Sequence, residues 1–416
     1  MTPPTHARDQ DLDRIDKKKH QLGHEQAPVG SVLIAPDKFK GSLSAPEVAD
    51  AIAAGIRKAR PELELRLVPV ADGGEGTVAA ALAAGAQRHR VRVTGPTGQP
   101  VDADIAIKGP TAIVELATAS GLTLVPHHKL APLTATSYGT GDLIRAALDA
   151  GARTIVLGVG GSACTDGGAG MLAALGARIT DASGTQLRPG GAALLNVSRV
   201  DLTTLDSRLA DTEVVLASDV DNPLLGKHGA ACVYAPQKGA DPSQVELLDT
   251  ALARWACAVA KGGDCDMVTA PSAGAAGGVG FAALAALGAR RRLGVEVILE
   301  LTGFLQQLQG ARLVITGEGR LDEQTLHGKA PAGVAQHART AGVPVIAIAG
   351  TCTLPAERLR KSGITSAYTL TSIERDVGRS MRNAAVLLEQ LGAQLATEQW
   401  PPNAWSSEHV RHSRQL

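Results

Sequence analysis

The stretch TIVLGVGGSACTDGGAG (154–170) decides how the rest of the chain is interpreted. Its first residues, 154–159, are apolar and predict a buried strand. A glycine-rich loop with a serine, a threonine and an aspartate follows at once, and residues 169–176 then predict a helix closed by a glycine. A strand that leads through such a loop into a helix presents backbone N–H groups to an anion. The stretch therefore predicts an α/β protein made of strand–loop–helix units, with a ligand site at the loops.

The same unit recurs near both ends of the chain. Strands are expected at 31–35 and 63–70, and Ser44 with Glu47 forms a capping box for a helix that ends near Arg60. Further strands and helices are expected at 213–218, 243–261, 274–288, 312–316, 331–341, 344–349, 367–370 and 378–397. This alternation predicts a parallel sheet with right-handed crossovers. By contrast, strand candidates at 88–94, 100–108 and 111–116 are joined by short turns, which favours antiparallel pairing.

The change of pattern predicts a discontinuous first domain with a second domain inserted into it. We place the first domain at residues 30–93 and 297–398 and the inserted α/β domain at residues 94–296. Residues 1–29 and 399–416 are polar, and we expect a disordered extension and a disordered tail there.

Composition excludes several classes of partner. Lys plus Arg and Asp plus Glu both number 41, so no basic field favours nucleic acid or an anionic membrane. The five cysteines lack any C-x-x-C spacing, which is typical of a reducing compartment. No apolar run reaches the ~20 residues of a membrane span, and residues 1–29 lack the apolar stretch of a secretory signal. We expect a cytoplasmic protein.

Polar loops follow the predicted strands, where open α/β sheets bind their ligands. These loops are DKFKGS (37–42), ADGGEGT (71–77), GGSACTDGG (160–168), SDVDN (218–222) and GEGRLD (317–322). Their lysines suit phosphate groups, and their carboxylates suit Mg²⁺. This inventory fits phosphoryl transfer, in which catalysis is mostly positioning and charge stabilisation.

Several of these features have a second interpretation. Asp72-Gly73-Gly74 and Asp166-Gly167-Gly168 could each be a simple turn. The pattern Gly158-x-Gly160-x-x-Ala163, with Asp181 about 20 residues on, matches a dinucleotide fingerprint and would indicate an NAD-dependent dehydrogenase. A non-catalytic sensor of sugar acids could use the same loops. The histidines have no ligand spacing, which argues against zinc.

Taken in order, the loops resemble those of the bacterial glycerate kinase family. The matching stretches are IAPDKFKGSLSA (34–45), PVADGGEGT (69–77), TGPTG (94–98), ATASGL (117–122), TSYGTGDLI (136–144), GVGGSACTDGGAG (158–170), SDVDNPLLG (218–226), YAPQKGA (234–240), GAAGGVG (274–280) and TGEGRLDEQTLHGK (316–329). The resemblance implies a Rossmann- or flavodoxin-like parallel-sheet domain, an inserted mixed α/β domain and an active site in the cleft between them. It also implies ATP and Mg²⁺ as cosubstrate and cofactor, D-glycerate as substrate and 2-phosphoglycerate as product, with 3-phosphoglycerate as the alternative. A homodimer stays open.

The resemblance also suggests roles for individual residues. Catalytic candidates are Asp219, Lys38 and Asp322, and metal candidates are Asp219, Asp221 and Glu318. Candidates for binding substrate or ATP are Asp37, Lys40, Ser42, Asp72, Gly73, Gly74, Glu75, Gly161, Ser162, Thr165, Asp166, Gly167, Gly168, Asn222, Gly317, Arg320 and Lys329.

Overall fold

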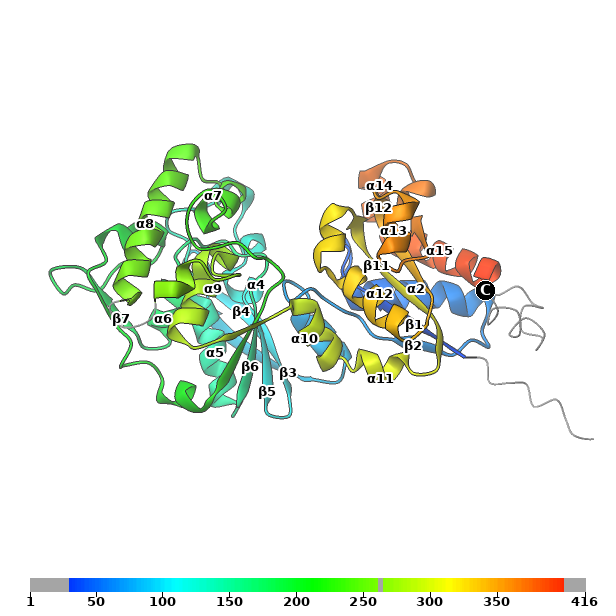
Figure 1. Cartoon of the computed structure of the whole chain (residues 1–416), viewed down its shortest axis with the longest axis horizontal. Helices are drawn as coiled ribbons and strands as arrows, with labels where there is room; N and C mark the ends of the chain where they lie inside the picture. Colours follow the sequence, from blue (N-terminus) through cyan, green and yellow to red (C-terminus); the bar gives the residue numbers. More distant parts are fainter. Residues whose placement is uncertain (1–29, 261–264, 400–416) are drawn as a thin grey trace, which may run out of the picture.

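The computed structural model describes residues 30–260 and 265–399. The predicted extension 1–29 and the predicted tail beyond residue 399 lie outside the described residues. Strands form two large sheets, sheet A and sheet B, which lie beside one another with helices around each (Figure 1). This arrangement confirms the predicted α/β fold class. Among the described residues, no helix has the length and apolar character needed to cross a membrane.

Sheet A is parallel and has the strand order β13-β12-β11-β1-β2. Its strands are β1 (Ser31–Pro36), β2 (Leu65–Leu67), β11 (Ala311–Leu321), β12 (Val345–Cys352) and β13 (Ser366–Thr369). Numbered along the chain, this is the 2-1-3-4-5 order of flavodoxin-like sheets. The order reverses between β1 and β11, where Pro36 pairs with Gly317. Ligands of such sheets bind beyond the carboxyl ends of the strands at this reversal.

Sheet B has the strand order β10-β9-β6-β5-β4-β3. Its strands are β3 (Gln87–Thr94), β4 (Pro100–Lys108), β5 (Thr111–Glu115), β6 (Thr154–Gly158), β9 (Glu213–Ala217) and β10 (Arg290–Arg292). The pairs β3–β4 and β4–β5 are antiparallel, as the short turns predict, and the remaining pairs are parallel. β7 (Arg178–Thr180) and β8 (Arg199–Asp201) form a separate ribbon. Because the chain joins sheet B at Gln87, it leaves sheet A before the predicted limit at residue 93; the division into domains stays a prediction.

Helices cover both faces of each sheet, and alternate strand residues supply the two cores. In β1, Val32 and Ile34 face α2 and α15, whereas Leu33 and Ala35 belong to the core that includes α10 (Gly294–Leu301), α11 and α12. One face of sheet B packs against α5, α6, α8 and α9. The bounds are α2 (Ala45–Ala59), α5 (Tyr138–Asp149), α6 (Ala169–Ala174), α8 (Pro242–Ala260), α9 (Ala275–Ala286), α11 (Phe304–Leu308), α12 (Ala330–Thr340), α13 (Ala356–Lys361) and α15 (Ala384–Gln399).

Two helices, α3 (Thr77–Ala83) and α10 (Gly294–Leu301), are shared by the two sheets. Their residues Val78 and Val297 pack on the second face of sheet B. Neighbouring residues Ala80 and Ile298 belong to the core of sheet A. α10 lies between the two groups of strands in Figure 1. The two sheets are therefore joined by packed apolar side chains as well as by the chain itself.

Local predictions are mostly confirmed, with three differences. The predicted capping box is present, since the Ser44 backbone N–H donates to Glu47 Oε2 at 2.8 Å. The strand expected at 63–70 shortens to β2, and the long helix expected at 378–397 breaks at Asn383 into α14 (Val377–Arg382) and α15. The helix expected at 274–288 is irregular at its start because Gly277 and Gly278 have positive φ. A Cβ at Gly277 would lie 2.2 Å from the Cys164 carbonyl oxygen, so this close approach requires glycine.

Candidate active site

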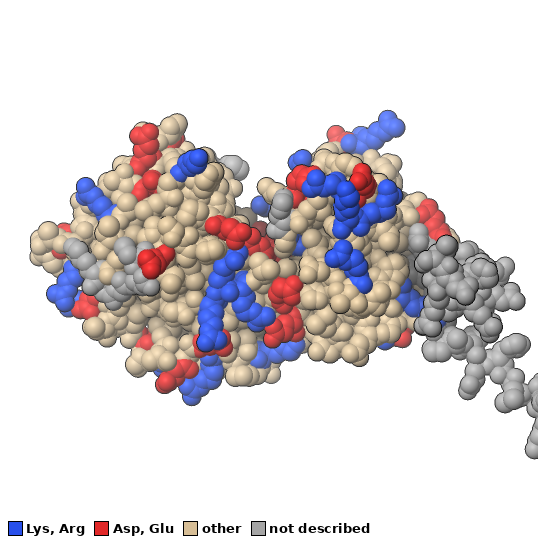
Figure 2. All heavy atoms as spheres, in the orientation of Figure 1, with Lys and Arg blue, Asp and Glu red and all other residues tan. Residues whose placement is uncertain are grey.

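The predicted loops of the two sheets meet in a cleft between them (Figure 2). A cavity of about 540 Å³, cavity 1, lies on the side of sheet B. A cavity of about 660 Å³, cavity 2, lies on the side of sheet A. The two share lining residues from the loops after β1, β2 and β6, namely Lys40, Asp72, Gly74, Glu75, Gly160 and Gly161. Because they share these residues, the two cavities form one continuous cleft.

The loop 71–76 forms the junction of the two cavities and belongs to both sheets. It leaves sheet A after β2 and lies directly on the end of β6, where a Cβ at Gly160 would be 2.7 Å from Gly74 Cα. Its far end is held by Glu115 at the end of β5, whose Oε2 accepts from the backbone N–H groups of Gly76 and Val78, both at 3.1 Å. Burial raises the pKa of Glu115 to about 7. Contact between backbones thus fixes this loop against sheet B.

Cavity 2 is lined by charged side chains from the loops after β1 and β11. Asp37 is buried, and burial raises its pKa to about 7 even though Lys38 Nζ lies 3.7 Å from its Oδ1. Glu318 is also buried; its Oε1 accepts from the Thr325 hydroxyl at 2.6 Å and its Oε2 lies 3.3 Å from Lys329 Nζ. Burial raises the pKa of Glu318 as well. The predicted residues Lys40, Ser42, Arg320 and Asp322 line the same cavity.

Two of these lining residues already have structural partners. The Ser42 hydroxyl donates to the Met381 carbonyl at 2.6 Å. Asp322 accepts from the backbone N–H of Gln324 at 3.0 Å as the cap of a short 3-10 helix, and lies 3.4 Å from Arg320 Nε. The catalytic role predicted for Asp322 would therefore compete with its capping role.

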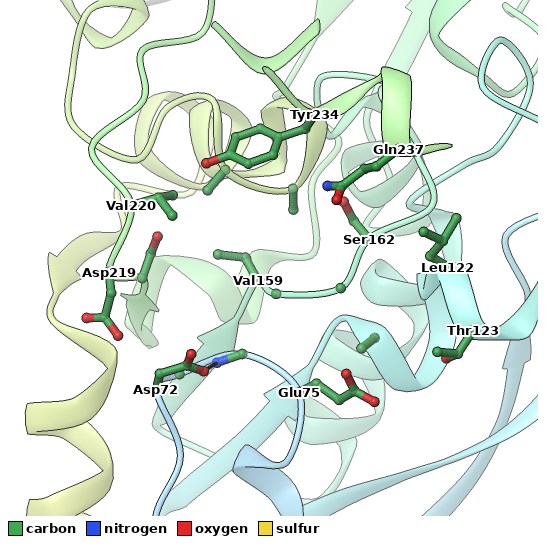
Figure 3. A pocket seen from close by; sticks show the side chains of 18 of the residues that line it. Asp72, Glu75, Leu122, Thr123, Val159, Ser162, Asp219, Val220, Tyr234 and Gln237 are labelled. Atoms are coloured by element: carbon green, nitrogen blue, oxygen red, sulfur yellow. Dashed lines mark hydrogen bonds between the residues drawn. The ribbon is translucent and has the colours of Figure 1, made fainter. Parts of the chain in front are cut away.

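Cavity 1 combines an acidic side with an apolar side (Figure 3). Asp219 and Asp72 lie on the acidic side, and Asp219 Oδ1 accepts from the Gly294 backbone N–H at 2.8 Å. Asp219 Oδ2 is buried and has no hydrogen-bond partner among the described residues. Burial, and then the nearby charge of Asp72, raise the pKa of Asp219 to about 7. The apolar side contains Leu122, Val125, Leu130, Val159, Ala275 and Ala276.

Some predicted site residues lie outside the two cavities. Asp166 is fully buried, and its Oδ2 accepts from the backbone N–H and the hydroxyl of Ser137 at 2.8 and 2.9 Å. Its Oδ1 accepts from the Gly168 backbone N–H at 3.2 Å. Thr165 and Gly167 are likewise buried around it. The second half of the opening stretch is therefore a structural turn that begins α6, and the cleft receives only its first half.

Three further predicted residues have other partners, and so does the acid of the rival fingerprint. Asp221 is largely exposed and pairs with Arg291 at 2.5 Å, and Asn222 bonds to Tyr234 and His228. Gly317 is buried within β11, where a Cβ would lie 1.9 Å from the Ile348 carbonyl oxygen.

Asp181 accepts from Ser183 and Thr185 in an exposed turn. It therefore does not stand at the cleft, where a ribose-binding acid of a dehydrogenase would be needed.

The three predicted metal ligands do not come together. Asp219 lines cavity 1, Glu318 lines cavity 2, and Asp221 faces solvent. In the part of the chain that the structure describes, no three or more His, Cys, Asp or Glu side chains are grouped as metal ligands. Asp219 and Asp72 are the carboxylates near one another on one wall, and Mg²⁺ usually takes one or two carboxylates together with substrate oxygens.

Sequence reasoning missed two residues of this site. Lys238 is buried behind cavity 1, and its Nζ donates to the Ser162 hydroxyl oxygen at 2.8 Å. Glu115 holds the junction loop. Neither follows a recognisable ligand pattern, and Lys238 and Ser162 are 76 residues apart in the sequence. For Lys238, the sequence signal was its place in YAPQKGA (234–240), one of the stretches that resemble the glycerate kinase family.

Known proteins resemble this chain over most of its length. Residues 32–399 match the model of the glycerate kinase family. The chain is 47% identical over 347 residues to glycerate 2-kinase of Escherichia coli K12, covering 82% of this chain and 91% of the relative. It is 44% identical over 368 residues to glycerate kinase of Bacillus subtilis 168, covering 88% and 96%. A crystal structure of a proposed glycerate kinase 2 from Salmonella typhimurium LT2 superposes with a TM-score of 0.76 at 42% identity, covering 93% of this chain and all of that one. The chain belongs to the glycerate kinase family.

Proposed function

We propose that the protein transfers the γ-phosphoryl group of ATP to the 2-hydroxyl of D-glycerate, giving ADP and 2-phosphoglycerate. The observation that carries the proposal is the joined cleft, which has one partly apolar cavity and one strongly charged cavity. Such a pair suits a nucleotide with an apolar base and a small acid, held with their reacting groups at the junction. Family membership supports the same chemistry.

The nucleotide fits cavity 1. Its base would pack against the apolar side, and its phosphates would lie along the loop 160–162 after β6, where backbone N–H groups and the Ser162 hydroxyl are available. Lys40 lines both cavities, so its ammonium group can balance charge on the phosphoryl group during transfer.

Glycerate fits cavity 2. Its carboxylate would pair with the cationic side chains of Arg320 and Lys329, and a bidentate arginine contact suits its shape. Asp37 is then the group we assign to accept the proton of the 2-hydroxyl. Its buried carboxyl has a pKa of about 7, which suits a base that works near neutral pH.

The acidic wall fits Mg²⁺. A buried carboxylate oxygen without a partner, Asp219 Oδ2, is costly unless a cation or donor satisfies it, and Asp72 provides a second carboxylate nearby. We propose that these two residues hold Mg²⁺ together with phosphate oxygens. The ion would supply charge neutralisation between the phosphate groups.

We further infer that each sheet with its helices is a domain. Every strand of sheet A comes from residues 31–67 or 311–369, and every strand of sheet B from residues 87–292. The inserted domain would therefore begin at residue 87, and α3 and α10 would form the contact between the domains.

The test is turnover with Mg-ATP and D-glycerate, monitored by ADP release and by phosphorus NMR of the product. We expect 2-phosphoglycerate, and little ADP release when L-glycerate replaces the D-form. A 3-phosphoglycerate signal would overturn the assigned hydroxyl, and absence of ADP release with D-glycerate would overturn the proposed function.

A further inference from the structure

A buried lysine stands directly behind the wall of cavity 1. Lys238 ends the 3-10 helix Pro236–Lys238 and is 1% exposed. Its Nζ donates to the Ser162 hydroxyl oxygen at 2.8 Å and to the Cys164 carbonyl oxygen at 2.5 Å. These acceptors are a hydroxyl and a carbonyl rather than a carboxylate. The ammonium group therefore brings a positive charge to the loop 160–164 that these hydrogen bonds do not neutralise.

Such a charge is costly to bury. Burial lowers the pKa of Lys238 to about 8, while the negative charge of Asp166 acts in the opposite direction. The group is thus still mostly protonated at neutral pH. A buried charge is weak evidence for a stabilising role, because packed apolar side chains often replace buried ion pairs without loss of stability. Stability alone is therefore a weak explanation for this lysine.

The position of Ser162 gives a better explanation. An ammonium group has three donors and no acceptor, so the Ser162 oxygen must accept from Lys238. The hydroxyl proton of Ser162 is then left for another acceptor. Ser162 belongs to the loop after β6 and lines cavity 1 beside Gln237 (Figure 3). A hydroxyl held in this way keeps its own proton for an acceptor other than Lys238, such as a group in cavity 1, and the charge behind it makes it a stronger donor.

We propose that Lys238 is a positioning residue that acts through Ser162, fixing and polarising its hydroxyl so that it donates to a phosphate oxygen of the nucleotide in cavity 1. This inference rests on the proposed function for the identity of the nucleotide. Lys238 itself does not reach the ligand, and its charge acts across one hydroxyl group. Because phosphate oxygens change their charge during transfer, the contact would contribute to turnover as well as to binding.

The test is a double-mutant cycle with Lys238→Met, Ser162→Ala and the double variant. We expect each single variant to lower kcat/KM for ATP by ~100-fold, the scale of one lost preorganised donor, and the double variant to be no worse than either. The same cycle on ADP binding, measured by calorimetry, should show equal and non-additive losses of affinity. Lys108→Met is the matched control, since Lys108 donates to two backbone carbonyls at the surface and lines neither cavity.

A further readout separates this role from a structural one. Lys238→Met leaves the Ser162 and Cys164 oxygens without this donor, so turnover and ADP affinity are compared per folded molecule, which removes any change in the free energy of unfolding. Turnover of the wild type should fall above about pH 8 as Lys238 loses its proton, and the variant should lack this fall. Additive losses in the cycle, or unchanged ADP affinity in all variants, would overturn the proposal. The ADP measurement tests the role of Lys238 even if the wild type fails to phosphorylate glycerate, so the two failures are distinguishable.

Discussion

The triplets Asp72-Gly73-Gly74 and Asp166-Gly167-Gly168 have the same sequence but differ in the burial and hydrogen bonding of their aspartates. Both follow a strand that is paired in parallel with its neighbours, and both precede a helix. Asp166 is fully buried and saturated with donors from the segment 136–137 and its own loop. Asp72 is half-buried, lines both cavities, and its Oδ1 accepts from the Gly74 backbone N–H at the long distance of 3.2 Å.

The difference lies in what surrounds each triplet. Ser137 and Gly170 approach Asp166 from two sides and compensate its charge with hydrogen bonds. Asp72 instead stands near other carboxylates, and its charge raises the pKa values of both Asp37 and Asp219. A carboxylate that is satisfied by the protein has a structural role, whereas one held among like charges is available to a cation from outside.

The largest expected effect is on turnover in Asp72→Asn. Removing this charge should weaken the hold on Mg²⁺ and lower kcat by ~100- to 1000-fold, the range of one lost electrostatic group. The free energy of unfolding should stay the same or rise, because repulsion from Asp37 and Asp219 is relieved. Steady-state kinetics and urea unfolding measure the two quantities.

Asp166→Asn is the matched control for this first variant, with the same chemical change in the same triplet. Its turnover per folded molecule should remain within about tenfold of the wild type, since Asp166 does not reach the cleft. Equal losses of kcat in the two variants would contradict the division between a functional and a structural aspartate.

The second effect is the loss of stability in Asp166→Asn. The new amide group must place donor hydrogens against donors of Ser137 or Gly168, and buried groups are left unpaired. We expect the free energy of unfolding to fall by about 2–3 kcal/mol. Urea unfolding followed by circular dichroism measures it, and a variant as stable as the wild type would disprove the capping role.

This comparison also shows how far the sequence could lead. Positions of loops could be predicted, because strand ends of a parallel sheet share one edge and the strands are recognisable as apolar runs. Lys38, Asp219 and Arg320, which this logic grouped, do line the two cavities, and their roles stay predictions. The roles of the two triplets could not be separated, because they depend on partners such as Ser137, which is 29 residues from Asp166.

Other misses have the same origin. The pairing of Lys238 with Ser162 is a long-range contact that no spacing indicates. Asp221 shares its loop with Asp219 and was predicted to share its role. Residues two apart point to the same side only in a regular strand, and this loop lies outside the strands, so Asp221 meets Arg291 instead. Patterns identify which loops matter, whereas packing decides which side chain of a loop faces the cleft.

The smallest expected effect concerns Glu115, a carboxyl buried like Asp166 but attached to the loop of Asp72. Its pKa of about 7 in the folded protein exceeds the usual value of 4.5, so the folded state binds a proton that the unfolded state releases between these limits. The contribution of Glu115 to the free energy of unfolding should therefore fall as the pH rises from about 4.5 to 7. Between pH 5 and 6 the fall should be at most about 1.4 kcal/mol, which corresponds to one proton.

Glu115→Gln isolates this contribution, because glutamine keeps a side-chain oxygen for the backbone N–H groups of Gly76 and Val78 but has no charge to bury. The difference in free energy of unfolding between variant and wild type should increasingly favour the variant from pH 5 to 7 and then level off. If the difference in free energy of unfolding between variant and wild type is constant from pH 5 to 7, Glu115 is charged throughout that range. Its hydrogen bonds to the loop of Asp72 would then resemble those of Asp166, and the two triplets would be anchored by the same chemistry after all.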